Sequence, residues 1–260
     1  MYFYLSFVWR IAICCVRARM IPQDLKDLNS GNTTDFAGVI LRPTIGTKMH
    51  GVSGTVSVYN PIVEKDQTSS AVIWVRSGPP DNSNIITIGW HNDSFKKTGC
   101  YNLDCSGFVQ ADNTITPGQS FNKTSFLNGL VINLPLSIFQ DPTTKDWWVS
   151  VEKKEIGYFP ASLFSNMTYV DEVAWMAITT TPLGTRSPSM GCGEFPMGIS
   201  NHGSYFKNPE FVNDFGQNQP LEKDDGHIYT SKFVCFGAEY IEDKDVGLSV
   251  EFGGPAGCNA

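Results

Sequence analysis

Basic residues are scarce relative to acidic ones in this chain. Lys and Arg number 19 against 26 Asp and Glu, which gives a formal net charge of −7 at pH 7. The field of such a molecule repels phosphate backbones, so a nucleic acid is not an expected partner. No apolar run approaches the roughly 20 uninterrupted residues that a membrane-spanning helix needs, so no transmembrane helix is expected either.

Sequence motifs of several common enzyme classes are also missing. The chain has no G-x-S-x-G elbow, no G-x-x-x-x-G-K-[ST] loop and no G-x-G-x-x-G fingerprint, so hydrolase, nucleotide and dinucleotide functions lack their local signals. The four histidines are scattered, and none stands at a metal-ligand spacing from another histidine or from a cysteine pair. We therefore expect no metal and no other cofactor. The four are His50, His91, His202 and His227.

What the chain does contain favours an all-β domain. Its 260 residues are 41% hydrophobic and 17% charged, with 24 Gly and 15 Pro, which is too apolar for disorder and too interrupted for a helical bundle. Short runs with period-two alternation or β-branched enrichment recur between Gly, Pro, Asn and Asp. Because no helices separate these runs, we predict antiparallel sheets stacked as a β-sandwich.

Ten segments have this strand pattern. Short helical turns are predicted only at Pro160–Phe164 and Asn208–Phe215. The predicted strands are Thr55–Tyr59, Ala71–Arg76, Ile85–Gly89, Gly107–Gln110, Leu130–Phe139, Trp147–Val151, Ile156–Phe159, Val173–Thr180, Ile228–Phe236 and Gly247–Phe252.

The N-terminal segment has part of the character of a signal peptide. Its apolar residues from Tyr2 to Val16 resemble the hydrophobic region of a signal, but Arg10 interrupts them and Arg17 and Arg19 follow them. We expect residues 1–20 to be a degenerate signal-like or misassigned segment and the domain to span residues 36–260. Seven cysteines and four N-x-S/T sequons, at Asn32, Asn92, Asn122 and Asn166, favour the secretory pathway.

Two short aromatic and cysteine motifs have testable structural consequences. Trp147 and Trp148 are a candidate sugar-stacking platform, but adjacent strand residues face opposite sides, so at least one is expected in the core. Cys100 and Cys105 enclose four residues in a turn-rich segment. A disulfide between them would close a small ring and constrain the unfolded chain by about 2 kcal/mol.

The segment around these cysteines, T-G-C-Y-N-L-D-C-S-G-F-V-Q from Thr98 to Gln110, resembles the hallmark of the plant neprosin domain. The resemblance extends over most of residues 36–258, because further motifs occur in the order of the family. It implies an antiparallel β-sandwich and a secreted glutamic peptidase that cleaves after proline. These motifs are Val58-Tyr59-Asn60-Pro61, Ile73-Trp74-Val75, Asp141-Pro142, Ile156-Gly157-Tyr158-Phe159-Pro160, Met190-Gly191-Cys192-Gly193 and Phe252-Gly253-Gly254-Pro255.

The resemblance also implies where catalysis would occur. Glutamic peptidases of this family use two carboxyls that share a proton, one of which acts as general base on a water. Thr87 stands at the place of the first glutamate and Ile178 at that of the second. Neither side chain titrates at acid pH. Glu194 is a weak substitute candidate, and an exposed structural role is the better expectation for it.

A second departure from the family concerns length. Only seven residues separate Trp90 from Thr98, where the family pattern has a further strand pair. We therefore expect a secreted, monomeric and non-catalytic relative that at most binds a proline-rich peptide or a cell-wall ligand in a residual cleft. The alternative is an active acid endopeptidase that cleaves after proline. If the alignment holds, Thr87 and Ile178 should share one concave face within about 10 Å.

A second disulfide is implied by a matching cysteine pair in the family. It would join Cys235 to Cys258 and close a ring of roughly 24 residues, which stabilises the fold by about 3 kcal/mol in the loop-entropy treatment. Cys192 would then be the odd thiol of the domain, and Cys14 and Cys15 would lie outside it.

Overall fold

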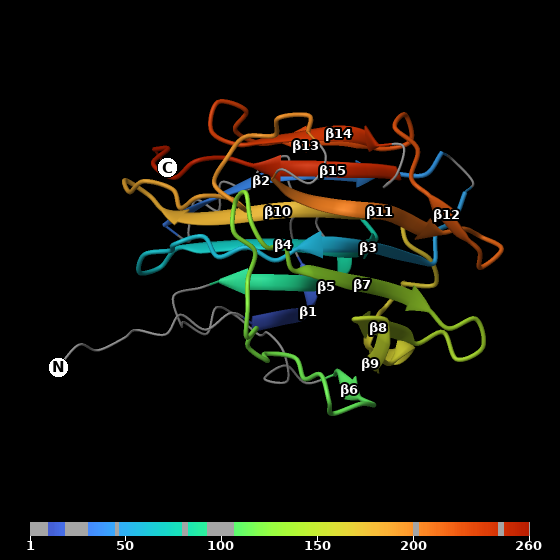
Figure 1. Cartoon of the computed structure of the whole chain (residues 1–260). Coiled ribbons are helices and arrows are strands. Elements are labelled where there is room, and N and C mark those ends of the chain that lie inside the picture. The colour runs from blue at the N-terminus through green and yellow to red at the C-terminus, as the bar shows by residue number, and fades with distance from the viewer. Residues whose placement is uncertain are drawn as a thin grey trace.

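Two antiparallel sheets form the fold (Figure 1). This computed structural model describes residues 10–18, 31–44, 47–79, 83–92, 107–199, 203–243 and 247–259, with backbone only for residues 10–18. The two antiparallel sheets confirm the expected β-sandwich. The six-stranded sheet has the order β1 (Arg10–Ala18), β5 (Ser83–Asn92), β4 (Thr68–Ser77), β10 (Glu172–Pro182), β2 (Asn32–Leu41) and β13 (His227–Thr230).

The second sheet has nine strands, and it packs over the first. A short 3-10 helix, η2 (Ala161–Leu163), follows β9 at the place of the first predicted helical turn. In order, the strands are β14 (Gly237–Asp243), β15 (Gly247–Gly253), β11 (Ser204–Val212), β3 (Gly51–Ser57), β7 (Asn133–Gln140), β8 (Trp147–Val151), β9 (Lys154–Phe159) and β6 (Val109–Gln110), with β12 (Asn218–Pro220) paired to β11.

Two of the predicted elements are wrong in part. No helical turn forms at Asn208–Phe215, because Asn208 to Val212 continue β11 past a bulge between Lys207 and Glu210. Asn208 has a φ of +47°, a left-handed conformation that asparagine tolerates and that fits a bulge as well as a turn. The strand predicted over Ile228–Phe236 ends at Thr230, and a turn follows it.

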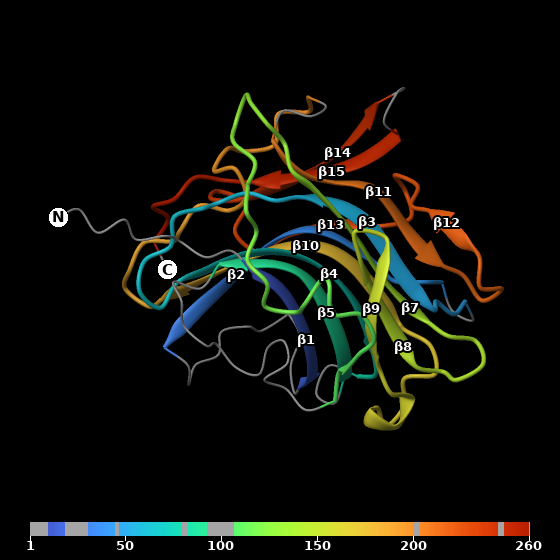
Figure 2. The same ribbon diagram turned by 60° about the horizontal axis from the view of Figure 1, so that its bottom comes forward.

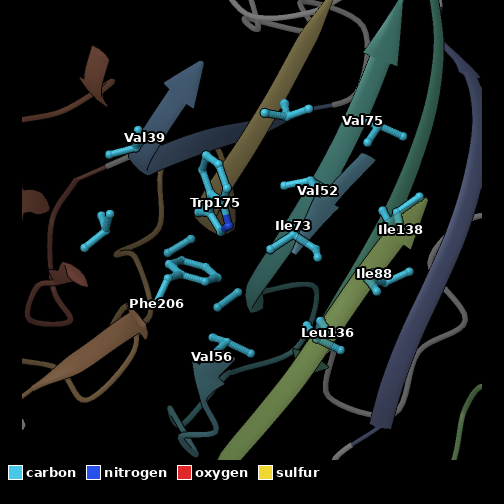
Figure 3. Close-up of a cluster of buried hydrophobic side chains, with 14 of the residues drawn as sticks. Val39, Val52, Val56, Ile73, Val75, Ile88, Leu136, Ile138, Trp175 and Phe206 are labelled. Carbon is cyan, nitrogen blue, oxygen red and sulfur yellow. The ribbon is translucent and has the colours of Figure 1, made fainter. Parts of the chain in front are cut away.

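The interior between the sheets is filled by the inward-facing residues of both. Successive strand residues alternate between faces, and most of the inward-facing residues of the central strands are apolar and buried. Figure 3 shows these side chains meeting from both sheets: Val39, Val52, Val56, Ile73, Val75, Ile88, Leu136, Ile138, Trp175 and Phe206.

Two tryptophans of the six-stranded sheet donate hydrogen bonds across this interior to β3. Trp175 Nε1 donates to the carbonyl of Ser53 at 2.8 Å, and Trp90 Nε1 donates to that of Ser57 at 3.0 Å. Both indoles are fully buried. Gly54 makes room for one of them, because a Cβ there would lie 2.9 Å from Trp175 Nε1. These bonds tie β5 and β10 to fixed positions on the opposite sheet.

The six-stranded sheet is buried on its outward side as well. Figure 2 shows its strands arching, so that the side turned away from the nine-stranded sheet is concave. A second cluster of buried apolar residues lies on that side, separate from the interior cluster. Its members are Phe36, Ile40, Val72, Trp74, Ala174 and Met176.

The disulfide between Cys235 and Cys258 is present, with 6.0 Å between its Cα atoms. It ties the turn between β13 and β14 to the C-terminal segment. Cys192 is a half-buried free thiol. Cys100 and Cys105 lie outside the described residues, as does most of the segment that resembles the neprosin hallmark.

The sandwich begins before the expected boundary at residue 36. β1 pairs with β5 from Arg10 opposite His91 to Ala18 opposite Ser83, and β2 starts at Asn32. Part of the segment expected to precede the domain thus belongs to its sheet. No helix among the described residues is long and apolar enough to cross a membrane.

The four sequons differ in accessibility. Asn122 and Asn166 are exposed, and Asn32 is half-buried. Asn92 is buried, and its Nδ2 donates to the carbonyl of Pro61 at 2.9 Å. Asn92 is therefore less accessible than Asn122 and Asn166, and glycosylation at the four positions stays a prediction.

We predict that Trp175→Phe lowers the free energy of unfolding by about 2 kcal/mol, because the substitution removes buried ring atoms and deprives the Ser53 carbonyl of its indole donor. Trp148→Phe serves as the control, since Trp148 is half-buried on the outer side of the sandwich. Chemical denaturation measures both variants. Equal losses of stability would contradict the proposed role of the Trp175 hydrogen bond.

Candidate functional site

The concave face consists of the outward-facing residues of the six-stranded sheet. The strand register arranges them in rows that cross β5, β4, β10 and β2. The first row is Ile85, Arg76 and Glu172; the second is Thr87, Trp74, Ala174 and Ile40; the third is Gly89, Val72, Met176 and Gly38; and the fourth is His91, Ser70, Ile178 and Phe36.

Thr87 and Ile178 both lie on the concave face, as expected, and both are half-buried. They are farther apart than expected. Thr87 pairs with Trp74 on β4, whereas Ile178 pairs with Ser70, two rows away on the same strand. With strands ~4.8 Å apart and ~3.3 Å per residue, their Cα atoms are separated by roughly 16 Å instead of about 10 Å.

One carboxylate, Glu172, lies on the concave face among the described residues of this sheet. Its side chain has no exposed surface. Trp74 Nε1 donates to Oε1 at 3.2 Å, and the guanidinium groups of Arg76 and Arg42 each donate to Oε2 at 2.8 Å. Both oxygens are therefore occupied by donors, and neither is open to a water molecule.

Glu172 was not predicted from the sequence, although a signal for it exists. Glu172 is six residues before Ile178 on one strand, and an even spacing places both on the same face. Its partners come from β4 and from Arg42 just after β2. Only the register of three strands brings them together.

His91 is a half-buried residue of the concave face near Ile178. It occupies the same row, with Ser70 between them. Its Nε2 atom is inaccessible to solvent, and burial lowers the pKa of the imidazole from 6.5 to about 4. A neutral ring is therefore maintained on this face down to acid pH.

The substitute candidate Glu194 is not on the concave face. It is exposed in the loop between β10 and β11, and its backbone carbonyl contacts Gly253 of the nine-stranded sheet. Glu251 of β15 anchors the same loop, since its Oε2 accepts the backbone N–H groups of Met197 at 3.0 Å and Gly198 at 3.3 Å. The structure does not bring Glu194 together with Thr87 or Ile178.

The tandem tryptophans divide between interior and surface, as expected. Trp147 is fully buried, and its Nε1 donates to the carbonyl of Met167 at 3.2 Å. Trp148 faces outward and packs against Tyr158 with ring centroids 4.8 Å apart. These two rings pack against each other, which uses part of the surface that a sugar ring would stack on.

The part of the chain that the structure describes also contains cavities away from the concave face. One, of about 960 Å³, is lined by loop residues at one end of the sandwich, among them Tyr59, Gln67, Arg186 and Cys192. Another, of about 590 Å³, contains His50, whose ring nitrogens contact Gln140 at 3.0 Å and Asp214 at 3.4 Å. Both ring nitrogens of His50 thus face side-chain oxygens.

The metal-ligating residue types do not gather in the part of the chain that the structure describes. No group of three or more His, Cys, Asp or Glu residues there has an arrangement that could hold a metal ion. His227 is exposed on β13, and His202 lies outside the described residues.

Comparison with known proteins identifies a family. The family model described as Neprosin matches residues 65–255. Among solved structures, the fold is similar to the crystal structure of Scytalido-glutamic peptidase with a peptide-based transition state analogue. That match has 12% sequence identity and a TM-score of 0.42, and it covers 86% of this chain and 99% of the other.

We predict that the pKa of His91 makes the fold less stable in acid. Because the unfolded chain takes up a proton near pH 6.5 and the folded chain only near pH 4, this contribution is fully present above pH 6.5 and is lost as the pH falls toward 4. The loss is about 2 kcal/mol at pH 5. Denaturation at pH 7 and pH 5 measures it.

His91→Gln should remove this pH dependence, whereas His227→Gln, at an exposed position, should leave it unchanged. If His91→Gln retained the full loss of stability between pH 7 and pH 5, the assignment of this loss to His91 would be wrong.

Proposed function

We propose, because this chain belongs to the neprosin family, that it is a non-catalytic relative of glutamic peptidases which retains peptide binding on its concave face. Its ligand is an extended, proline-containing peptide that it holds without cleaving. The family match spans residues 65–255, which include Thr87 and Ile178, the positions that the sequence resemblance assigns to the glutamates of the family. Because their Cα atoms are roughly 16 Å apart, the proposal rests on the chemistry of the concave face and not on that assignment.

The observation that carries this proposal is the chemistry of the concave face. Thr87 and Ile178 supply no titratable group there, and the carboxylate of Glu172 is fully engaged by an indole and two guanidinium groups. A general base must accept a proton from water, and none of these groups is placed to do so. Loss of a positioned acid or base costs on the order of 10² to 10⁴ in rate, so loss of both leaves little turnover.

Binding places fewer demands on this face than catalysis does. Its rim is half-buried and apolar at Ile85 and Ile178, and Arg42 leaves 56% of its side chain exposed at one end. Such a surface accommodates the apolar rings of proline residues, with a cation available to an anionic group of the ligand. A cell-wall glycan is less well supported, because Trp74 on this face is buried and its N–H is occupied by Glu172.

Export from the cell is part of the proposal. The disulfide between Cys235 and Cys258 persists in oxidising compartments. Asn122 and Asn166 present sequons at exposed positions. Both features support a secreted glycoprotein.

We predict that the purified protein does not cleave a proline-rich peptide at acid pH, as measured by mass spectrometry of the products. An active member of the family is the positive control. Cleavage after proline by the unmodified chain would reject the proposal and favour the alternative, an active acid endopeptidase.

The double substitution Thr87→Glu with Ile178→Glu should also remain inactive in this assay. The two positions are roughly 16 Å apart at Cα, whereas carboxyls perturb each other's titration strongly only within about 4–6 Å. Turnover comparable to that of the active relative would show that the register separates the two positions less than we infer.

We predict that Ile178→Lys weakens binding of a fluorescent proline-rich peptide by about tenfold, equivalent to about 1.4 kcal/mol. The substitution places an unpaired charge on a half-buried part of the concave face. Val109→Lys, on β6 at the far edge of the nine-stranded sheet, is the matched control. Fluorescence anisotropy measures both, and equal affinities for the two variants would place the peptide elsewhere.

A further inference from the structure

A second binding surface lies on the nine-stranded sheet. We propose that the free edge of β14 binds an extended, positively charged peptide segment by adding it to the sheet as a further strand. This surface is separate from the concave face, so the inference does not depend on the proposed function.

The first observation is the position of β14 at the end of its sheet. It pairs with β15 over its whole length, from Gly237 opposite Gly253 to Asp243 opposite Gly247, and with no other strand of the described chain. Figure 1 shows β13, the last strand of the other sheet, close to it at the same side of the sandwich. An edge strand presents unpaired backbone N–H and C=O groups, which an extended peptide can satisfy.

The second observation is the charge along this edge. Glu239 and Glu242 are exposed on β14, and Asp224 and Asp225 are exposed in the turn before β13. That turn lies against β14, because a Cβ on Gly226 would come within 2.7 Å of the Tyr240 hydroxyl.

Negative side chains therefore flank the backbone edge from both sides. Two copies of β14 paired with each other would place like charges together, which disfavours a homodimer through this edge. A chain rich in Lys or Arg has the complementary charge.

The third observation is a group of exposed apolar side chains at the start of β14. Phe233 and Val234, in the turn that leads into the strand, are 81% and 67% exposed. Phe195 is 40% exposed, and its ring lies beside the first residue of β14, Gly237. Large apolar side chains gathered on a soluble surface commonly mark an interaction site.

The disulfide makes this apolar group a suitable anchor. Cys235 follows Val234 directly, and its bond to Cys258 holds the turn in place. A turn fixed before binding loses less conformational entropy when a ligand orders against it. Charged edge strands alone often serve to prevent association. Here two exposed apolar residues, Phe233 and Val234, lie beside the charged edge in a turn held by the disulfide, and this combination favours a partner that has both basic and apolar residues. We infer a basic segment with an apolar residue at the end that meets Phe233.

The test uses a synthetic ten-residue peptide of alternating Lys and Thr with a terminal Leu, added to the full chain at low salt. Fluorescence anisotropy should show saturable binding that weakens as salt is added. The same peptide with Glu in place of Lys should not bind. A version with alternate backbone nitrogens methylated should bind at least about tenfold more weakly, because it cannot complete the ladder of backbone hydrogen bonds.

Variants locate the site. Glu239→Lys with Glu242→Lys should reduce affinity for the lysine peptide at least about tenfold, or about 1.4 kcal/mol. Glu152→Lys, in the turn between β8 and β9, with Glu155→Lys, near the start of β9, changes the net charge equally far from this edge and should leave affinity nearly unchanged. Hydrogen exchange should show peptide-dependent protection at residues 237–243.

The inference would be overturned by no binding of the lysine peptide, by equal loss in both double variants, or by protection that omits residues 237–243. Equal binding of the methylated peptide would likewise exclude strand addition. Because no arm of this test involves cleavage or the concave face, its failure leaves the proposed function unaffected, and the reverse also holds.

Discussion

Two indole hydrogen bonds that cross the interior determine which residues reach the surface of the six-stranded sheet. Trp90 and Trp175 donate to carbonyls of β3, so their strands cannot slip by one residue without removing a buried indole from the core. Thr87 lies three residues before Trp90, and Ile178 lies three residues after Trp175. An odd spacing turns both to the concave face, opposite the indoles that fix the register.

The burial of side chains on the concave face supports the proposal that this face binds a peptide without cleaving it. A buried carboxylate is stable only with partners for its charge, and Glu172 is held by Trp74, Arg76 and Arg42. Burial beside Ile178 keeps His91 neutral. A water-activating carboxyl needs both solvent and a free oxygen, and this face offers neither at Glu172. A largely uncharged extended peptide meets fewer obstacles there.

Alternation along the chain predicted the architecture and most central strands, including β8 with its bounds, because both sheets of a sandwich impose a period of two. Strands whose sequences contain turn-forming residues were missed. β11 contains an Asn-Pro step that forms a bulge, and β2 contains Asp35, whose carboxylate is buried as an acceptor for Ser231. The prediction that Thr87 and Ile178 share one face of the sheet came from the family resemblance and from the alternation of strand residues between faces. Their spacing, and the partners of Glu172, depend on cross-strand register that no local pattern reports.

Photo-crosslinking tests the central claim most directly, namely that the concave face is a peptide-binding surface without catalytic groups. A proline-rich peptide carrying a benzophenone would be irradiated with the intact chain, and the adducts would be located by mass spectrometry. We expect intact peptide attached to β5 and β10, at or beside Thr87 and Ile178. Adducts confined to the nine-stranded sheet or to the loops at its ends would contradict it.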